Sequence, residues 1–266
     1  MFIPDYHLHA QFSNDSTATV ADYCHYASQI GLKEISITEH LTFYEGDKNF
    51  QDFDYVSYIK EIERCRQLFE SKVEIKAGLE IDYHPYLEDK IKNKIAKWDK
   101  LDLIIGAVHY VEGRSVIKSK IEKENIKDFV EDYLKIMEKL IKSGLCDIIG
   151  HFDVFRRSTG ETYQMELHLN TNTIKNILAK AANKNLALEI NTSSFKHGLN
   201  DTFPCAEIVK LFKSCGGKYI TIGSDAHHLE ELATYQEKGI AVAKQAGFHK
   251  ISCYKKRKPS LMSLQP

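Results

Sequence analysis

Histidine and carboxylate residues recur in this sequence at positions that suit metal binding. His7 and His9 are two residues apart in an apolar segment, so their imidazoles would lie on one face of an extended strand. The other candidates each follow a further short apolar segment: His40, Glu80, His109, His151, Asp225 and His227. Imidazole nitrogens and carboxylate oxygens without thiolates suit zinc, iron or manganese. The set is too large for one ion, so it predicts two or three metals with a bridging carboxylate, an arrangement that hydrolyses phosphate esters.

The apolar segments before these residues predict the strands of a parallel α/β fold. Seven of them are short and rich in β-branched residues: 2–8, 34–38, 74–80, 102–108, 147–150, 186–191 and 219–223. Helical periodicity predicts helices between them, at 19–30, 55–71, 87–98, 126–143, 172–184 and 204–214. The alternation and the length of 266 residues predict one α/β barrel domain, residues 1–266, with the candidate ligands at the catalytic, C-terminal face of the strands.

Three connections are too long for simple turns and are expected to carry function. They span 39–54, 109–125 and 151–171, and each leaves the C-terminal end of a predicted strand. The remaining C-terminal residues predict three further features, a helix at 239–246, an extra strand at 250–254 and a solvated basic tail with the sequence KKRKP at 255–259.

Composition argues against several classes of protein. Lys and Arg total 36 against 37 Asp and Glu, a formal net charge of -1, so no global field would draw the chain onto nucleic acid or an anionic membrane. No stretch approaches the roughly 20 apolar residues of a membrane helix. The N-terminus lacks the basic start and apolar core of a signal peptide. Six scattered cysteines without a CxxC pair suit reduced thiols, so we expect a cytoplasmic protein. The sequence does not specify the oligomeric state, although the lack of a heptad seam argues against a coiled coil.

Six motifs in order resemble those of the polymerase and histidinol phosphatase (PHP) superfamily. They are His7-x-His9, Thr38-Glu39-His40, Gly78-Leu79-Glu80, Gly106-Ala107-Val108-His109, Gly150-His151-Phe152-Asp153 and Gly223-Ser224-Asp225-Ala226-His227. Three further segments resemble the histidinol-phosphate phosphatase branch: Asp153-Val154-Phe155-Arg156, Glu189-Ile190-Asn191-Thr192-Ser193 and Tyr254-Lys255-Lys256-Arg257-Lys258-Pro259.

The resemblance implies a distorted (β/α)7 TIM-like barrel with a trinuclear metal cluster at the C-terminal face of the strands. By position, the first metal would be held by His7, His9, Glu80 and Asp225. Glu80 would bridge to a second metal on His109 and His151, and the third would lie on Asp15, His40 and His227. Many members have His where this chain has Asp15, which makes the third site the one whose affinity and metal identity the sequence leaves open.

Several of these residues have a second interpretation. Asp15 precedes a predicted helix and could be its N-cap. Glu80 could pair with a surface lysine, although a carboxylate at the end of an apolar strand is costly without a strong partner. Glu39 is expected to be solvated or to orient an imidazole without binding metal, and Asp153 could orient His151 in the same way. The other histidines are expected to be surface or packing residues: His25, His84, His168, His228 and His249.

A phosphatase also needs cations aimed at the phosphoryl oxygens. Arg156 and Arg157 lie in a loop at the predicted catalytic face, and a guanidinium matches phosphate geometry. Adjacent side chains diverge, and the family pattern favours Arg156 as the one that points inward. A second polar group follows the sixth strand and consists of Ser193, Lys196 and His197; a solvated loop is the alternative for the last two. Three aromatic residues near the predicted catalytic face could flank the imidazole ring of a substrate or pack in a lid: Phe43, Tyr44 and Tyr110.

The leading functional hypothesis is a metal-dependent phosphomonoesterase that converts L-histidinol phosphate to L-histidinol and phosphate in histidine biosynthesis. A hydroxide bridging two metals would attack phosphorus in line, and the catalytic set would include Asp225, His227 and Arg156. His197 or a metal-bound water would give a proton to the leaving alkoxide. The alternatives are a phosphoesterase for nucleotides or oligonucleotide ends, and a regulatory PHP module without metals.

Overall fold

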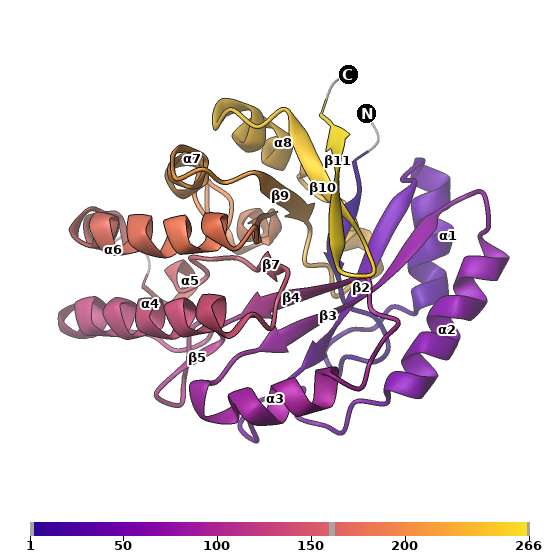
Figure 1. Ribbon diagram of the computed structural model, residues 1–266, viewed down its shortest axis with the longest axis horizontal. Coiled ribbons are helices and arrows are strands. Elements are labelled where there is room, and N and C mark those ends of the chain that lie inside the picture. The colour runs from indigo at the N-terminus through magenta and orange to yellow at the C-terminus, as the bar shows by residue number, and fades with distance from the viewer. Residues whose placement is uncertain (1–2, 160–162, 265–266) are drawn as a thin grey trace.

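A computed structural model describes residues 3–159 and 163–264 of the chain. Its centre is a parallel sheet of seven strands in the order β1-β2-β3-β4-β7-β8-β9 (Figure 1). Their bounds are β1 Asp5–Leu8, β2 Glu34–Leu41, β3 Glu74–Asp82, β4 Leu103–Ala107, β7 Ile148–Ile149, β8 Ala187–Asn191 and β9 Tyr219–Gly223. A parallel bridge between Leu8 and Ala226 brings the two ends of the sheet together. The sheet is therefore a nearly closed barrel, and the prediction of a distorted (β/α)7 barrel is confirmed.

Helices form a layer around the barrel (Figure 1). They are α1 Val20–Ile30, α2 Tyr55–Leu68, α3 Glu88–Ile95, α4 Ile126–Ser143, α6 Tyr163–Asn183, α7 Ala206–Ser214 and α8 Gln236–Gln245, with a short α5 at Arg156–Thr159. Residues at the helix ends explain where α1 and α4 begin or end. Thr19 caps α1 in a capping box with Asp22, and α1 and α4 end at Gly31 and Gly144 in the left-handed conformation that glycine adopts without strain.

The strands are apolar because both of their faces are covered. In β4, Leu103 and Ile105 face the barrel interior and pack with Tyr6, whereas Ile104 packs in the larger core between the sheet and the helices. This larger core contains residues from Ile3 near the N-terminus to Leu264 near the C-terminus.

Two of the three long connections contain structure that the sequence did not indicate. The segment 109–125 contains a small hairpin, β5 (Tyr110–Val111) with β6 (Arg114–Ser115). The segment 151–171 is not a loop throughout, since it contains α5 and the first turns of α6. The start of α6 was missed because its sequence, YQMELHLNT, has good helix formers but no regular apolar stripe. Residues 160–162 of this segment lie outside the described residues.

The C-terminal residues form a hairpin that closes the N-terminal end of the barrel. Strand β10 (Lys250–Lys255) confirms the predicted extra strand and pairs antiparallel with β11 (Lys258–Ser263). The prediction of a solvated basic tail is confirmed only in part. Lys255, Lys256 and Lys258 are exposed, whereas Arg257 in the turn of this hairpin bonds to Asp147 just before β7.

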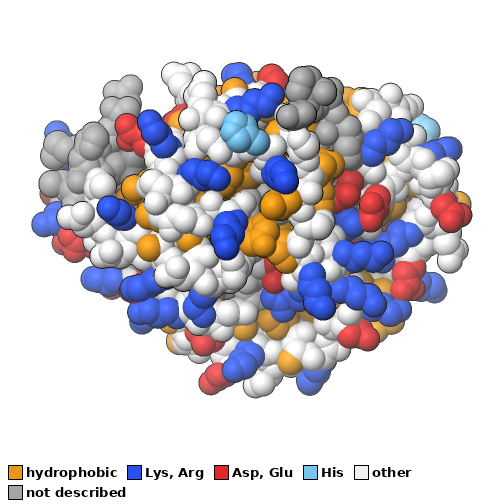
Figure 2. Space-filling view, turned by 45° about the horizontal axis from the view of Figure 1, so that its top comes forward, with side chains coloured by type: hydrophobic (Ala, Val, Ile, Leu, Met, Phe, Trp, Pro, Cys, Tyr) orange, Lys and Arg blue, Asp and Glu red, His pale blue; other side chains and the backbone are white. Residues whose placement is uncertain are grey.

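No helix among residues 3–159 and 163–264 is long and apolar enough to cross a membrane. The six cysteines are free thiols. On the face shown in Figure 2, basic side chains are spread over the surface between small apolar areas.

Candidate metal centre and substrate cavity

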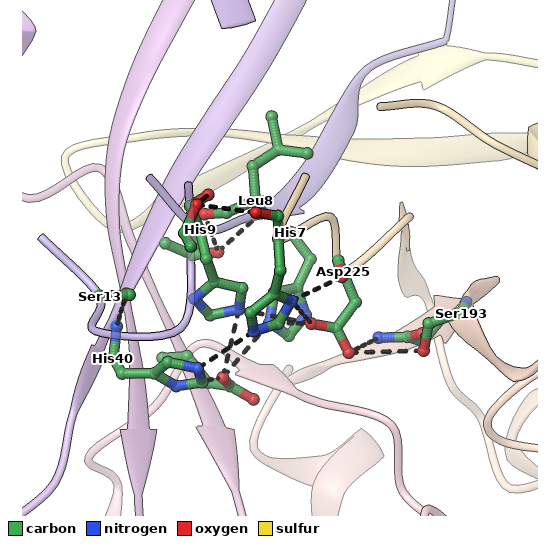
Figure 3. A network of polar contacts seen from close by, with 12 residues as sticks. His7, Leu8, His9, Ser13, His40, Ser193 and Asp225 are labelled. Atoms are coloured by element: carbon green, nitrogen blue, oxygen red, sulfur yellow. Dashed lines mark hydrogen bonds and ion pairs between the residues drawn. The ribbon is translucent and has the colours of Figure 1, made fainter. Parts of the chain in front are cut away.

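Nine side chains predicted as ligands converge at the C-terminal ends of the strands. These side chains come from β1 and the residues after it, from β2 and β3, and from the segments that follow β4, β7 and β9. Seven of the nine line a cavity of about 300 Å³: Asp15, His40, Glu80, His109, His151, Asp225 and His227. His7 and His9 lie buried beneath its floor. Figure 3 shows His7, His9, His40 and Asp225 pointing toward one another.

The first group of ligand atoms has the spacing of a tetrahedral metal site. His7 Nε2 lies 3.5 Å from Glu80 Oε2 and 3.7 Å from Asp225 Oδ1. His9 Nε2 lies 3.5 Å and 3.4 Å from the same two oxygens. Ligand atoms at about 2.1 Å from a tetrahedral ion are about 3.4 Å from one another. These four side chains can therefore share one ion with little rearrangement.

The two oxygens of Glu80 face different sets of histidines. Oε2 belongs to the first group, whereas Oε1 lies 2.7 Å from His151 Nε2 and 3.6 Å from His109 Nε2. Glu80, His109 and His151 are near enough together to hold an ion. Glu80 thus has the placement of a carboxylate that bridges two metals.

A third group contains Asp15. Its Oδ2 lies 3.5 Å from both His40 Nε2 and His227 Nε2, and these two nitrogens are 3.4 Å apart. The alternative role of Asp15 as a helix N-cap is wrong, since Thr19 caps α1. Lys48 Nζ also contacts Asp15 Oδ2, at 2.9 Å.

Unpartnered polar atoms show that these residues fit metals. Among the described residues, no hydrogen-bond partner exists for five buried atoms of the cluster: His7 Nε2, both ring nitrogens of His9, His151 Nδ1 and Asp15 Oδ1. Buried polar atoms without partners are costly. Metal ions would satisfy such atoms, and the nitrogen and oxygen donor set without thiolates suits zinc, manganese or iron.

The charges in the cluster favour ionised carboxylates. Burial would raise the pKa of Glu80, but His7, His109 and the histidines bonded to it hold that pKa well below its usual range. Asp225 behaves in the same way because of His7, His9 and His227. Burial and the neighbouring His40 and His227 lower the pKa of His9 well below its usual value. Metal ligands must be deprotonated, so these three shifts favour metal binding. Despite burial, neighbouring carboxylates raise the pKa values of His7, His40 and His109, and a metal ion would displace the protons of these imidazoles.

Two buried carboxylates that the sequence analysis did not assign to the site orient its imidazoles. Glu189 on β8 contacts His7 Nδ1 at 2.6 Å and accepts a hydrogen bond from His151 N at 2.7 Å. Asp82 at the end of β3 lies 3.4 Å from His109 Nδ1 and accepts from His109 N. Such partners fix the orientation of metal-binding histidines. The signal in the sequence was an acidic residue inside an apolar strand, where charge is rarely buried without a partner.

The carboxylates that were expected to orient imidazoles have other partners. Glu39 accepts hydrogen bonds from Ala10 N and Ser13 Oγ, and so holds the segment after β1. Asp153 accepts from Cys205 N and lies 3.4 Å from Arg156 Nη1.

The backbone around the cluster is closely packed and locally strained. A Cβ atom at Gly223 would lie 2.5 Å from His7 Cβ and 2.6 Å from Glu189 Oε1, so only glycine fits there. Asp225 has a φ of 54°, in the left-handed region that is unfavourable for a residue with a side chain. The fold therefore holds His7 and Asp225 in fixed positions.

The structure corrects the expected orientation of the two arginines. Arg157 lines the cavity. Arg156 does not: it is buried, donates from Nη1 to Thr202 O at 2.7 Å, and lies over the ring of Phe203. The two residues form the first turn of α5, so their side chains diverge, and Arg157 is the one that faces the site.

Ser193, Lys196 and His197 line the same side of the cavity as predicted from their position after β8. Lys196 Nζ donates to Asp225 O at 3.2 Å and pairs with Glu231 at 2.9 Å. Burial, Arg157 and Lys196 lower the pKa of His197 to about 4, so this imidazole is neutral at pH 7.

The aromatic residues separate into two places. Tyr110 lines the cavity, and Tyr44 packs against it with ring centroids 4.5 Å apart. The prediction that Phe43 contacts substrate is wrong, because this ring lies in a separate groove with Phe50 and beneath Lys90. His84, expected to be a packing residue, is buried against Tyr44.

The profile of the PHP domain family matches residues 5–193. This chain belongs to the PHP domain family. The match covers β1 to β8 and therefore every predicted ligand except Asp225 and His227.

Relatives of this PHP protein are similar over nearly their whole length. The histidinol-phosphatase of Lactococcus lactis is 29% identical over 257 residues, which cover 94% of this chain and 93% of the relative. The probable histidinol-phosphatase of Deinococcus radiodurans is 27% identical over 237 residues, 86% of this chain and 87% of the relative.

Solved structures share the PHP fold. A crystal structure of histidinol phosphate phosphatase from Lactococcus lactis, complexed with zinc, L-histidinol and phosphate, has a TM-score of 0.85 and 27% sequence identity, and covers 97% of this chain and 98% of that one. The putative histidinol phosphatase of Listeria monocytogenes matches in fold, with a TM-score of 0.79 at 22% identity over 88% of this chain and 98% of that one.

Proposed function

We propose that this PHP protein is a metal-dependent phosphomonoesterase that hydrolyses L-histidinol phosphate to L-histidinol and phosphate. The observation that carries the proposal is the convergence of three groups of ligand atoms in and beneath the floor of a cavity with Arg157 in its wall. A relative of the same fold was crystallised with zinc, L-histidinol and phosphate, which supports this substrate.

The nine predicted ligands would hold two or three divalent ions. Glu80 would bridge the first group, with His7, His9 and Asp225, to the second, with His109 and His151. Zinc is favoured because the relative binds it, and manganese and iron are accepted by the same donor types. When bound, the ions would supply an activated water and neutralise charge on the phosphoryl oxygens.

Other side chains of the cavity would bind the phosphoryl group, hold Asp225 in place and protonate the leaving group. Arg157 presents a planar guanidinium that can bind two phosphoryl oxygens at once. Ser193 donates to Asp225 Oδ2 at 3.4 Å, and Lys196 binds Asp225 O, so both hold the aspartate in place. We assign His197 as the proton donor to the leaving alkoxide, since a bound phosphate dianion would raise its low pKa.

The proposed substrate is small, and its charge is met within the cavity. A volume of about 300 Å³ is at the lower end of the range for small-molecule sites. The free thiols suit a reducing compartment, and we place the reaction in the cytoplasm.

A substrate panel tests the proposal. Purified protein, reloaded separately with zinc, manganese or iron, is assayed for phosphate release from L-histidinol phosphate, nucleoside monophosphates and short oligonucleotides with terminal phosphates. We expect kcat/KM for L-histidinol phosphate to exceed the others by at least about 10²-fold. Faster hydrolysis of nucleotides would overturn the substrate assignment, and equal rates with and without metal would overturn the metal dependence.

A further inference from the structure

The wall of the cavity contains a carboxylate, Asp47, that the proposed hydrolysis does not use. It lies in the connection between β2 and α2 and is half-buried. Asp47 Oδ2 accepts a hydrogen bond from Tyr110 OH at 2.8 Å, and Oδ1 accepts from Asn49 N at 2.7 Å. Each oxygen is thus held by one donor, and the carboxylate has a fixed orientation.

The charge of Asp47 has no basic partner among the described residues. Within the described chain, no Lys, Arg or His nitrogen lies within 4.0 Å of its oxygens, and the adjacent Lys48 instead contacts Asp15 at 2.9 Å. A carboxylate oxygen can accept more than one hydrogen bond, so both oxygens retain acceptor capacity. An oriented, unneutralised carboxylate in a cavity wall favours a cationic ligand group.

Aromatic packing holds this part of the wall close to the metal centre. Tyr110 follows the ligand His109 directly and extends to Asp47. Tyr44 packs on Tyr110 and on His84, with centroid distances of 4.5 Å and 4.8 Å. Tyr110 therefore connects the carboxylate of Asp47 to the chain directly after His109. The ring of Tyr110 adds a surface that attracts cations.

We propose that Asp47 binds the ammonium group of the substrate, and that the enzyme thereby selects phosphate monoesters of amino alcohols. This inference rests on the proposed function. In L-histidinol phosphate the amine is on the carbon next to the one that bears the ester oxygen, so a phosphoryl group at the metals brings the ammonium only a short distance up the cavity wall. Asp47 contacts the alcohol part of the substrate and not the reacting atoms.

Two enzymes and two substrates test the contact. The variant Asp47→Asn removes the charge with little change of shape, and the analogue 3-(imidazol-4-yl)propyl phosphate differs from L-histidinol phosphate only in lacking the amine. We expect D47N to lower kcat/KM for L-histidinol phosphate by about 10- to 100-fold, mainly through KM, because a charge-assisted bond is lost. For the analogue, D47N and wild type should agree within about threefold.

Glu45→Gln is the matched control, because Glu45 is exposed in the same connection and does not line the cavity. We expect E45Q to leave both substrates unaffected. An equal loss on both substrates in D47N would assign Asp47 to the structure of the wall and overturn the proposal. Unchanged kinetics of D47N on L-histidinol phosphate would also overturn the proposal.

Product binding separates failure of this inference from failure of the proposed function. Calorimetry with L-histidinol should show affinity weakened in D47N by a factor similar to the change in KM, with metal content and thermal midpoint unchanged. If wild type hydrolyses neither ester, the proposed function fails, and calorimetry alone decides on Asp47: weaker L-histidinol binding by D47N supports the contact, and equal binding overturns it.

Discussion

The two ends of the barrel both bury charged residues, but they satisfy them differently. At the N-terminal end, Asp147 is bonded through both oxygens to Arg257, and Asp102 accepts from Arg66 and from Lys256 N. At the C-terminal end, His7 and His9 are fully buried, and His7 Nε2 and both ring nitrogens of His9 have no hydrogen-bond partner among the described residues. The protein supplies the partners at the N-terminal end, whereas bound metal ions would supply them at the C-terminal end.

This difference separates stability from function. Charges paired within the protein fix the hairpin β10–β11 onto the barrel, and breaking them should lower stability without changing the chemistry. Buried ligand atoms without partners destabilise the folded chain, and bound metals would offset that cost. Substitutions at the two ends should therefore change different observables.

The largest expected effect is at Glu80, whose oxygens face two histidine groups. Glu80→Gln keeps the shape but removes the charge, and we expect kcat/KM to fall by about 10³-fold or more, with loss of bound metal. Metal analysis and phosphate release on the same sample measure both. Glu74→Gln on the same strand is the control, since Glu74 is exposed at the opposite end of β3 and pairs with Lys76. Full metal content and activity in E80Q would contradict the bridging role.

A smaller effect is expected for the arginine that lines the cavity. Arg157→Ala should lower kcat/KM by about 10²-fold at unchanged metal content, because phosphoryl charge loses one partner. Arg156→Ala should instead lower the thermal midpoint, since its guanidinium bonds to Thr202 O and Asp153 below the cavity. The reverse pattern, with catalysis depending on Arg156 and stability on Arg157, would show that the two side chains are exchanged in solution.

At the N-terminal end, Arg257→Ala tests the structural role of the hairpin. The variant loses two bonds to Asp147 and one to Leu145 O, so we expect unfolding to become easier by about 1–3 kcal/mol. Activity per folded molecule and metal content should be unchanged. Chemical denaturation gives the free energy, and a selective loss of kcat at full stability would remove the distinction between the two ends.

The smallest effect is expected for Tyr254→Phe in the same hairpin. Only the hydroxyl bond to Asp147 O, at 3.3 Å, is lost, while the ring stays packed against Tyr6. Stability should fall by about 1 kcal/mol or less, without kinetic change. A loss as large as that of R257A would indicate that the hydroxyl bond of Tyr254 contributes as much to holding the hairpin as the ion pair of Arg257 does.

Much of the barrel was predictable because its signals are local. Each buried strand is a short apolar run, and the ends of parallel strands meet at one face, so His40 and Glu80 could be placed together from the sequence. The chain's order of motifs then predicted the PHP family, which the family profile confirms.

Other features depend on contacts that a linear sequence does not contain. Whether Arg156 or Arg157 enters the cavity depends on the rotation of the short helix α5, and neither residue type nor spacing determines that rotation. Asp82 and Glu189 lie in strands covered on both faces, so alternation does not show which side chain points inward. Phe43 was misplaced for a related reason, since neighbouring aromatics in an irregular connection leave in different directions.

The most direct test of the central claim measures the rate of phosphate release from L-histidinol phosphate against the number of metal ions bound per chain. Protein freed of metal by chelation is titrated with zinc, and bound metal and initial rate are determined at each step. We predict negligible hydrolysis without metal, a rate that rises with occupancy until the ligand groups are filled, and no such rise for E80Q. A fully loaded wild-type protein that releases no phosphate, or a metal-free protein that is equally active, would contradict the account.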